Sequence, residues 1–225
     1  LPGFRIVTGP AVGQDAPRSA FIPSWEVVQT GAGQALLLQT FFVSPDRLDP
    51  EWLKAHNAVL FDPPRSFEPP RLLDQDAQPF DGAAFQGNWS VLFFGFTYCP
   101  DVCPTTLALL RDVAGALPAG TYPVRFYLVS VDPARDTPAV LKPYIAHFSP
   151  EFRALTGEFL DVHRFATQLS IPFRKSVEAD GNYTIDHSAN LALINPQGHF
   201  AGFLMPPFDK ERVVQVLVVL GWGDH

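Results

Sequence analysis

The sequence contains only two cysteines, Cys99 and Cys103, among its 225 residues. Two thiols are too few for a disulfide-stapled mini-protein, for an iron–sulfur protein with four thiolates or for a four-cysteine zinc site. Any thiol chemistry therefore depends on this one pair.

Basic side chains and long apolar runs are also scarce. Lys and Arg number 16 against 23 Asp and Glu, which gives a formal net charge of -7. A phosphate-binding surface needs the opposite balance, so nucleic acid is not an expected partner. The longest apolar runs, such as Val91 to Phe96, fall far short of the roughly 20 residues that cross a bilayer. No membrane anchor is therefore visible in this sequence.

Apolar residues make up 47% of the chain, which is enough for a folded core. At roughly 150 residues per domain, the length suggests one domain with an extension. We expect an N-terminal extension over residues 1–65 and a folded domain over residues 66–225.

The extension has three recognisable parts. Ser24 to Thr30 and Gln34 to Val43 flank Gly31-Ala32-Gly33, which favours a hairpin, although the second run also suits a helix. Asp49-Pro50-Glu51 predicts a short helix with an Asp cap and Pro in its first turn. Six prolines between residues 44 and 70 predict an extended linker.

Strand and helix patterns alternate after residue 66. Ser90 to Thr97 is a continuous apolar run, typical of a strand buried on both faces, and Pro104 to Leu117 has helical spacing. Val124 to Val131 predicts a second buried strand, and Asp136-Thr137-Pro138 predicts the cap and first turn of a helix through Phe148. This order predicts a parallel βαβ unit.

The last third adds a helix over Asp161 to Leu169, an antiparallel hairpin and a closing helix over Asp209 to Leu220. The hairpin is predicted from Asn190 to Asn195 and His199 to Leu204, which flank a Pro-Gln-Gly turn. The order βαβα followed by ββα matches a thioredoxin-like α/β fold, a mixed central sheet with flanking helices.

Both cysteines lie where the first buried strand turns into its helix. Such a junction places side chains at the carboxyl end of the sheet, where open α/β folds bind ligands. Three intervening residues can form one turn that lets the two sulfurs bridge or share one ion. A structural disulfide is the plain alternative, but closing so short a loop removes little entropy from the unfolded chain.

A soft-metal site with two thiolates would use one of the six histidines. His187 lies in a polar loop before the strand that starts at Asn190, and in a thioredoxin-like sheet this loop faces the cysteine corner. We therefore predict that His187 points at both sulfurs. The others have no comparable placement and are interpreted as surface or structural: His56, His147, His163, His199 and His225.

Two thiolates and one imidazole suit Cu(I) best. Cu(II) would need an added oxygen, and structural zinc would need a fourth protein ligand. Asp101 and Asp186 are candidates for an extra ligand or a supporting hydrogen bond, although acids at such places are more often helix caps or solvated turn residues.

At these residues the sequence resembles the Sco/SenC family of thioredoxin-like copper-binding proteins. The matching segments are FFGFTYCPDVCPTTL at 93–107, VDPARDTP at 131–138, LTG at 155–157 and DHS at 186–188. Through these positions the resemblance implies that Cys99, Cys103 and His187 are the ligands of one copper ion, Cu(I) or Cu(II).

The resemblance implies a metallochaperone rather than an enzyme. Its target would be the binuclear copper centre of a cytochrome c oxidase subunit, on the periplasmic side of the bacterial inner membrane. A thiol-disulfide oxidoreductase that acts on the cysteines of that subunit is the alternative. Another copper chaperone or a thioredoxin-like reductant would be a further partner.

The chain departs from the family pattern at one turn, and one matching segment also has a local interpretation. Asp76-Ala77 stands where the family usually has Asp-Gly, so we expect that turn to adopt a conformation that Ala tolerates. In the VDPARDTP segment the simplest interpretation is local, with Asp136 and Pro138 starting a helix. The family's usual membrane anchor has no counterpart here, and residues 1–45 match nothing.

Other chemistries fit the residues less well. Thioredoxins usually space their cysteines C-x-x-C, so the extra residue argues against a tuned redox couple without forbidding one. A binuclear copper electron-transfer motif needs His and Met where Leu107 and Leu110 stand, and a blue-copper site needs one Cys, two His and commonly an axial Met, whereas Met205 is expected to pack. A Cys–His hydrolase lacks a nucleophile elbow and a His-orienting Asn.

Overall fold

The computed structural model describes residues 5–8, 23–29, 35–41, 49–119, 122–177 and 182–222. The chain divides into two compact units, residues 1–48 with 222–224 and residues 49–221 with 225. In the first unit, β1 (Arg5–Thr8), β2 (Pro23–Gln29) and β3 (Ala35–Phe41) form an antiparallel sheet in that order. The predicted hairpin is thus present as strands β2 and β3, while its Gly31-Ala32-Gly33 turn lies outside the described residues.

The second unit begins with the short helix that the Asp-Pro-Glu signal predicts. In α1 (Pro50–Ala55) the Asp49 carboxylate accepts the N–H of Glu51 at 3.1 Å, and Pro occupies the first turn. Strand β4 (Ala58–Arg65) follows and pairs with strand β13 (Phe200–Leu204). Both α1 and β4 therefore belong to the larger unit, which begins at Asp49 and not at residue 66.

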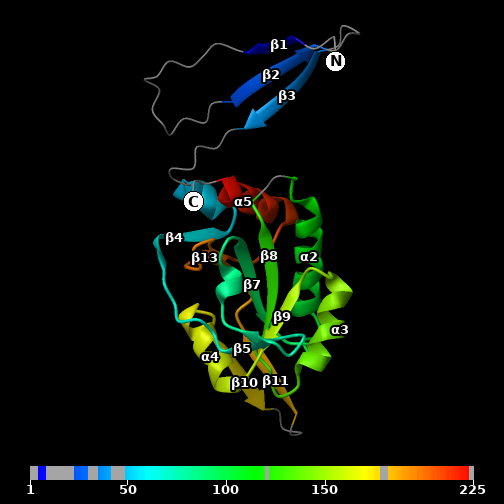
Figure 1. The fold of residues 1–225 in the computed structure, drawn as a ribbon, viewed down its shortest axis with the longest axis vertical. Helices are drawn as coiled ribbons and strands as arrows, with labels where there is room; N and C mark the ends of the chain where they lie inside the picture. The colour runs from blue at the N-terminus through cyan, green and yellow to red at the C-terminus, as the bar shows by residue number, and fades with distance from the viewer. Residues whose placement is uncertain are drawn as a thin grey trace. The chain divides into compact units, whose positions relative to one another are not determined.

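The main sheet has eight strands in the order β4-β13-β12-β7-β8-β9-β5-β6 (Figure 1). The central strands β7, β8 and β9 are parallel, and β12 pairs antiparallel with both β7 and β13. The bounds are β5 (Leu72–Asp74), β6 (Pro79–Phe80), β7 (Trp89–Gly95), β8 (Val124–Ser130), β9 (Arg153–Thr156) and β12 (Leu191–Ile194).

Four helices flank this sheet, near the predicted positions (Figure 1). The connection from β7 through the first of them to β8 is the predicted parallel βαβ unit. A 3₁₀ turn, η1 (Ala83–Phe85), precedes β7. The helices are α2 (Val102–Ala116), α3 (Pro138–Phe148), α4 (Phe159–Gln168) and α5 (Lys210–Trp222).

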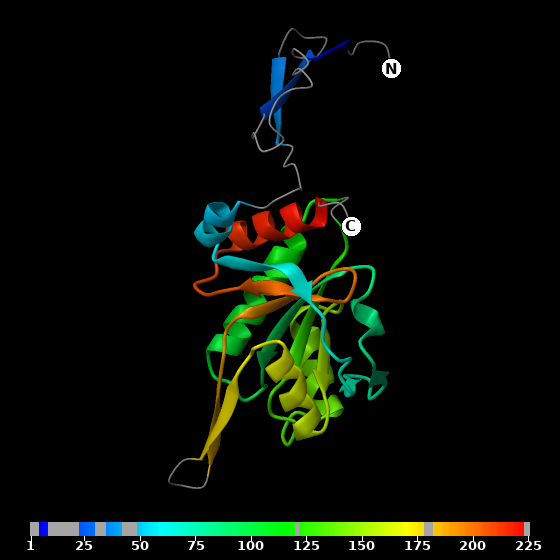
Figure 2. The same cartoon turned by 90° about the vertical axis from the view of Figure 1, so that its left-hand side faces the viewer.

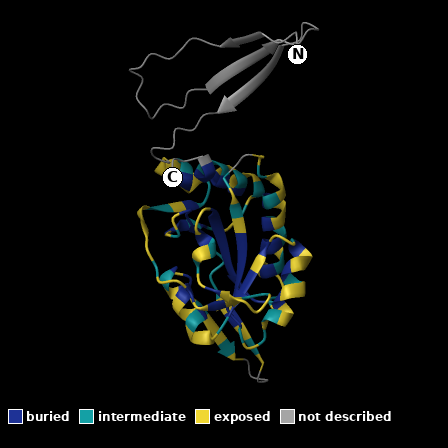
Figure 3. Ribbon diagram, in the orientation of Figure 1, coloured by how far each residue is buried: buried dark blue, intermediate teal, exposed yellow. Residues whose placement is uncertain are grey.

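The core lies on the central strands. Every residue of β7 and of β12 is buried, as expected for strands covered on both faces (Figure 3). Phe85 packs edge-to-face with Phe80 and Tyr127, and its ring stacks on that of Phe165, with centroids 6.2 Å apart. Full burial of one such Phe contributes about 1.5–3 kcal/mol, so this aromatic cluster helps to hold Phe85 before β7 and Phe165 of α4 in the core.

A second hairpin stands apart from the main sheet and was not predicted. Strands β10 (Phe173–Val177) and β11 (Tyr183–His187) pair antiparallel, with Phe173 opposite His187. Figure 2 shows this hairpin, in yellow and orange, extending away from the sheet. The sequence expectation of a polar loop around His187 is therefore wrong, because this residue is the last of a strand.

The turn at Asp76-Ala77 also differs from expectation. Ala77 has φ 58°, in the left-handed region that non-glycine residues rarely adopt. The Asp74 carboxylate accepts the N–H groups of Asp76 and Gln78, each at 2.9 Å, and its carbonyl accepts the N–H of Ala77 at 3.0 Å. These three hydrogen bonds hold Ala77 in a conformation that suits glycine better.

Among the described residues, no helix combines the length and the apolar character that a bilayer crossing demands.

Candidate metal centre

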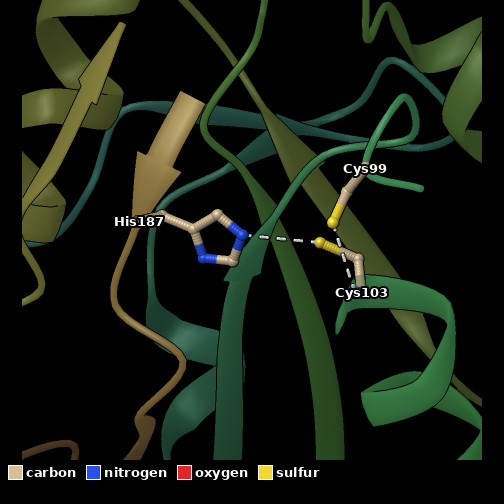
Figure 4. Close-up of side chains that lie close together, drawn as sticks. All are labelled: Cys99, Cys103 and His187. Carbon is tan, nitrogen blue, oxygen red and sulfur yellow. Dashed lines mark hydrogen bonds between the residues drawn. The ribbon is translucent and has the colours of Figure 1, made fainter. Parts of the chain in front are cut away.

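The structure brings Cys99, Cys103 and His187 together (Figure 4). One ligand atom from each residue lies within 4.8 Å of the other two. The Cys103 Sγ and His187 Nε2 atoms are 3.5 Å apart, although 84 residues separate them in sequence. The predicted convergence of the imidazole on the sulfur pair is therefore present in the folded chain.

The cysteines are placed by the turn between β7 and α2. Cys103 lies in the first turn of α2, and its backbone N–H donates to the Cys99 sulfur at 3.3 Å. The Cys99 N–H in turn donates to the Phe96 carbonyl at 3.3 Å. Cys103 is fully buried and Cys99 is partly exposed, so only one of the two sulfurs is directly accessible from outside.

Gly95, the last residue of β7, leaves room for the buried sulfur. A Cβ atom at this position would lie 2.9 Å from Cys103 Sγ and 2.9 Å from the Phe93 ring. Contacts that short are repulsive, so any larger residue would displace the thiol. The Phe-Gly-Phe pattern before the cysteines thus has a steric reason.

Burial sets the protonation state of Cys103 and His187. It raises the pKa of the Cys103 thiol strongly, and the contact with Cys99 adds to this effect. Burial also lowers the pKa of His187 below its ordinary value of 6.5, against smaller opposing effects of the Ser188 carbonyl and Asp186. At neutral pH the metal-free site therefore holds a protonated Cys103 thiol beside a neutral imidazole.

The tautomer of His187 leaves Nε2 free to bind a metal. Its Nδ1 lies 3.0 Å from the Ser188 carbonyl, which can only accept a hydrogen bond, so Nδ1 carries the proton. The lone pair of Nε2 then faces the Cys103 sulfur. The rings of Phe93 and Phe96 lie edge-on to the imidazole, with centroids 5.9 and 5.8 Å away, and they fix its orientation.

Comparison with known proteins fits this geometry. The family model for SCO1/SenC matches residues 63–220. This chain belongs to the SCO1/SenC family. A protein of Stutzerimonas stutzeri described as copper-binding is 40% identical over 162 residues, which cover 72% of this chain and 79% of that protein.

Solved structures of SCO1/SenC relatives agree with the predicted thioredoxin-like α/β fold. Arabidopsis thaliana ScoI with copper bound aligns with a TM-score of 0.64 and 29% identity, over 68% of this chain and 95% of that one. Yeast Sco1 with copper bound aligns with a TM-score of 0.63 and 32% identity, over 69% and 87%. Copper is thus the metal found in these relatives.

Asp136 has a role in this SCO1/SenC chain that sequence reasoning missed. We expected it to start a helix, but the N-cap residue of α3 is Thr137, followed by Pro138 as predicted. Asp136 is fully buried instead, and its carboxylate accepts the N–H of Thr97 at 3.0 Å and the hydroxyl groups of Thr97 and Ser130 at 2.5 and 2.6 Å. It thereby ties the approach to Cys99 to the end of β8.

Tyr144 is a second residue that no sequence signal marks. Its hydroxyl is buried and has no hydrogen-bond partner within the described part of the chain. Burial raises the pKa of Tyr144, and its electrostatic interactions with Cys103 and Cys99, whenever these are ionised, and with Asp136 add to the rise. The phenol therefore belongs to the electrostatic surroundings of the sulfur pair.

The remaining candidates lie outside the three-residue group. Asp186 accepts the Ser176 hydroxyl at 3.0 Å across the hairpin, and Asp101 is exposed without a capping bond from its side chain. Within the described residues, neither acid joins the group that could hold a metal. The same holds for His56, His147, His163 and His199, and His225 lies outside the described residues.

Proposed function

We propose that this protein is a copper metallochaperone that binds one copper ion through Cys99 Sγ, Cys103 Sγ and His187 Nε2. The observation that carries the proposal is the convergence of these three soft donors, from opposite parts of the fold, within 4.8 Å of one another. Copper bound to the solved relatives supports the choice of metal.

The donor set favours Cu(I) as the bound state. Thiolate and neutral imidazole are soft ligands, and a set of three suits the low coordination number of Cu(I). Structural zinc is almost always four-coordinate, and the described residues supply no fourth His, Cys, Asp or Glu to this group. Cu(II) would need an oxygen ligand from elsewhere.

Copper would leave the site from the Cys99 side, because Cys103 is buried and Cys99 is partly exposed. A thiolate of the recipient would bind the ion as the Cys99 sulfur dissociates, and Cys103 and His187 would follow. Tyr98 and Val102, 66% and 44% exposed, flank this approach with apolar surface. Exchange of the two thiols with a partner disulfide, which takes up the two electrons and two protons and is reduced to two thiols, would form a Cys99–Cys103 disulfide. This would remove both thiolates and prevent loading.

We propose that the recipient is the copper-site subunit of a cytochrome c oxidase, on the periplasmic side of the bacterial inner membrane, as the family resemblance implies. A binuclear copper centre offers the recipient cysteines that this exchange needs. Another copper chaperone would load the site, or a thioredoxin-like protein would keep its cysteines reduced.

A thiol-disulfide oxidoreductase is the second candidate function. It is favoured by the unequal exposure of the cysteines, since Cys99 can reach a partner and Cys103 lies beside it. The Cys99 thiolate would attack the partner's disulfide, and one partner thiol would leave. Attack by Cys103 on the mixed disulfide would then release the second thiol and form the Cys99–Cys103 disulfide.

Anaerobic titration of reduced protein with Cu(I), against a competing chelator, tests the copper proposal. We expect uptake of one ion per chain, no tight uptake by Cys99→Ser or Cys103→Ser, and weaker retention by His187→Ala. His199→Ala is the matched control, because His199 is exposed and lies outside the group. Preference for stoichiometric zinc, or uptake indifferent to His187, would overturn the proposal.

The same variants separate the two functions. A metallochaperone loses copper retention in His187→Ala and reduces few protein disulfides. Turnover of a protein disulfide that survives His187→Ala would favour the oxidoreductase.

A further inference from the structure

Arg135 lies between the two segments that carry the predicted ligands. Its guanidinium carbon is 4.8 Å from the centre of the Tyr98 ring and 3.9 Å from that of Tyr183. Tyr98 directly precedes Cys99, and Tyr183 begins the strand β11 that ends at His187. One cation therefore contacts both the cysteine turn and the histidine hairpin.

Asp132 holds both Arg135 and Tyr183 in place. Its Oδ2 forms an ion pair with Arg135 Nε, and its Oδ1 accepts the Tyr183 hydroxyl at 2.9 Å. The Asp132 side chain is 4% exposed and that of Arg135 is 26% exposed, so the pair is only weakly screened by water. A second cation, Lys175 Nζ, lies 3.4 Å from the centre of the Tyr183 ring. We call Asp132, Arg135 and Tyr183 the anchoring cluster.

The hairpin that carries His187 is attached to the domain through side chains. Besides the anchoring cluster, the base of the hairpin packs against aromatic rings: Phe173 against Phe159 and His163, and His187 against Phe93 and Phe96. Strands β10 and β11 form a two-stranded sheet of their own, separate from the main sheet. Ile185 is the one buried residue of β11, and β10 contains none. An isolated two-stranded hairpin is marginally stable at best, so its position depends on side-chain contacts with the rest of the domain.

We infer that Arg135 is a positioning residue that holds His187 Nε2 against the two sulfurs. It does so by clamping Tyr183 to Asp132 and to the cysteine turn, and it does not itself contact the metal. The inference rests on the proposed copper site. It assigns to the Arg of VDPARDTP a long-range task, in addition to the start of α3 at Pro138 in the same segment.

The expected effect on copper is large but indirect. Partners that orient metal ligands typically contribute about 10- to 100-fold to metal affinity. Arg135→Met keeps an unbranched apolar stem, shorter than that of Arg, and removes the planar cation. We therefore expect it to weaken Cu(I) binding about 10-fold or more. Arg135→Lys should not restore the affinity fully, because an ammonium group lacks the flat surface that stacks on two tyrosines.

A double-mutant cycle provides the test, with Cu(I) affinities of wild type, Arg135→Met, His187→Ala and the double variant. If Arg135 acts through His187, its replacement weakens binding in the wild type and changes the affinity of His187→Ala by less than about twofold. Losses that multiply in the double variant would overturn the inference. Arg111→Met is the matched control, because Arg111 is exposed and pairs only with Asp112 among the partners described for it.

Tyr183 offers a second route should Arg135→Met fail to fold. Tyr183→Phe keeps the ring between the two cations, whereas Tyr183→Leu removes it. We expect Tyr183→Leu to weaken copper binding more than Tyr183→Phe, and equal affinities for the two variants would contradict the clamp.

Amide hydrogen exchange of the metal-free protein tests the positioning without copper. Arg135→Met should speed exchange in β11 by about tenfold or more while leaving β7 unchanged, because β11 depends on the cluster and β7 is held by the buried core. Unchanged exchange in β11 would overturn the inference. Uptake of copper that ignores His187 in the wild type would overturn the proposed function instead, so the two failures are distinguishable.

Discussion

The Asp136 carboxylate binds both the backbone N–H and the hydroxyl of Thr97, across 39 residues of sequence, at 3.0 and 2.5 Å. Thr97 is two residues before Cys99, so a fully buried acid fixes the start of the cysteine turn. The same carboxylate accepts the Ser130 hydroxyl at the end of β8. The turn is thus tied to the parallel core of the sheet as well as to its own helix, where the Cys103 N–H donates to the Cys99 sulfur.

Replacement of Asp136 by Ala should therefore destabilise the fold. Three donors, the buried Ser130 hydroxyl and two groups of the half-buried Thr97, would lose their acceptor, and we expect the free energy of unfolding to fall by about 3 kcal/mol. Asp136→Asn keeps one acceptor oxygen and should lose less. Chemical denaturation measures both, with the exposed Asp112→Ala, expected within about 0.5 kcal/mol of wild type, as control. A loss below about 1 kcal/mol for Asp136→Ala would contradict the prediction.

Ala77→Gly should stabilise the protein. At φ 58° the methyl group of Ala77 is strained, and glycine adopts this conformation without that penalty. We expect a gain of up to about 1 kcal/mol in the free energy of unfolding, partly offset by the greater freedom of glycine in the unfolded chain. Ala114→Gly, inside α2, is the control. This change should lower the free energy of unfolding by about 1 kcal/mol, because glycine is unfavourable in a helix. Equal losses in both variants would show that the turn imposes no strain.

Acidification should destabilise the metal-free protein through His187. Its pKa is lowered in the folded state, so the unfolded chain binds this proton first. Stability is therefore unaffected by His187 above its ordinary pKa of 6.5 and falls as the pH drops below it, by at most about 1.4 kcal/mol per pH unit. Denaturation at a series of pH values should show a smaller loss for His187→Gln. A greater loss of stability on acidification in His187→Gln than in the wild type would contradict a lowered pKa of His187.

Copper affinity should rise with pH through Cys103. Because burial raises the pKa of this thiol far above neutrality, binding as a thiolate releases its proton. One released proton raises the affinity about tenfold per pH unit. Chelator competition between about pH 7 and pH 8, together with direct measurement of proton release, checks this dependence. His187→Ala should keep the slope, and a pH-independent affinity would contradict it.

The parts of the fold that sequence reasoning recovers are those with strong local patterns. The continuous apolar run from Val91 to Phe96 is entirely buried. It forms most of β7 and the residue that follows this strand. The helical spacing after Pro104 likewise corresponds to α2. The spacing of apolar residues is enough to predict these two elements, because their apolar side chains pack into one core. The ligand trio was predicted because the order of these elements places His187 opposite the cysteine turn.

The hairpin of β10 and β11 lacks such a pattern. Its strands are largely exposed and mix charged with apolar residues, so their pairing leaves little trace in the sequence. The contacts of Asp136 with Thr97 and of Arg135 with Tyr183 are invisible for another reason. Each joins residues distant in sequence, and a local rule assigns the Asp to the nearest helix start.

Because His187 is 84 residues from Cys103 in sequence, bound copper would stabilise the folded protein. An ion held by both the β7–α2 turn and the hairpin binds the folded chain more tightly than the unfolded one, which offers only the two neighbouring cysteines. By mass action, free copper at 1,000 times its dissociation constant would add up to about 4 kcal/mol to the free energy of unfolding. Under the proposed function, the empty carrier is the form that proteases degrade faster, and its abundance in the cell follows the supply of metal.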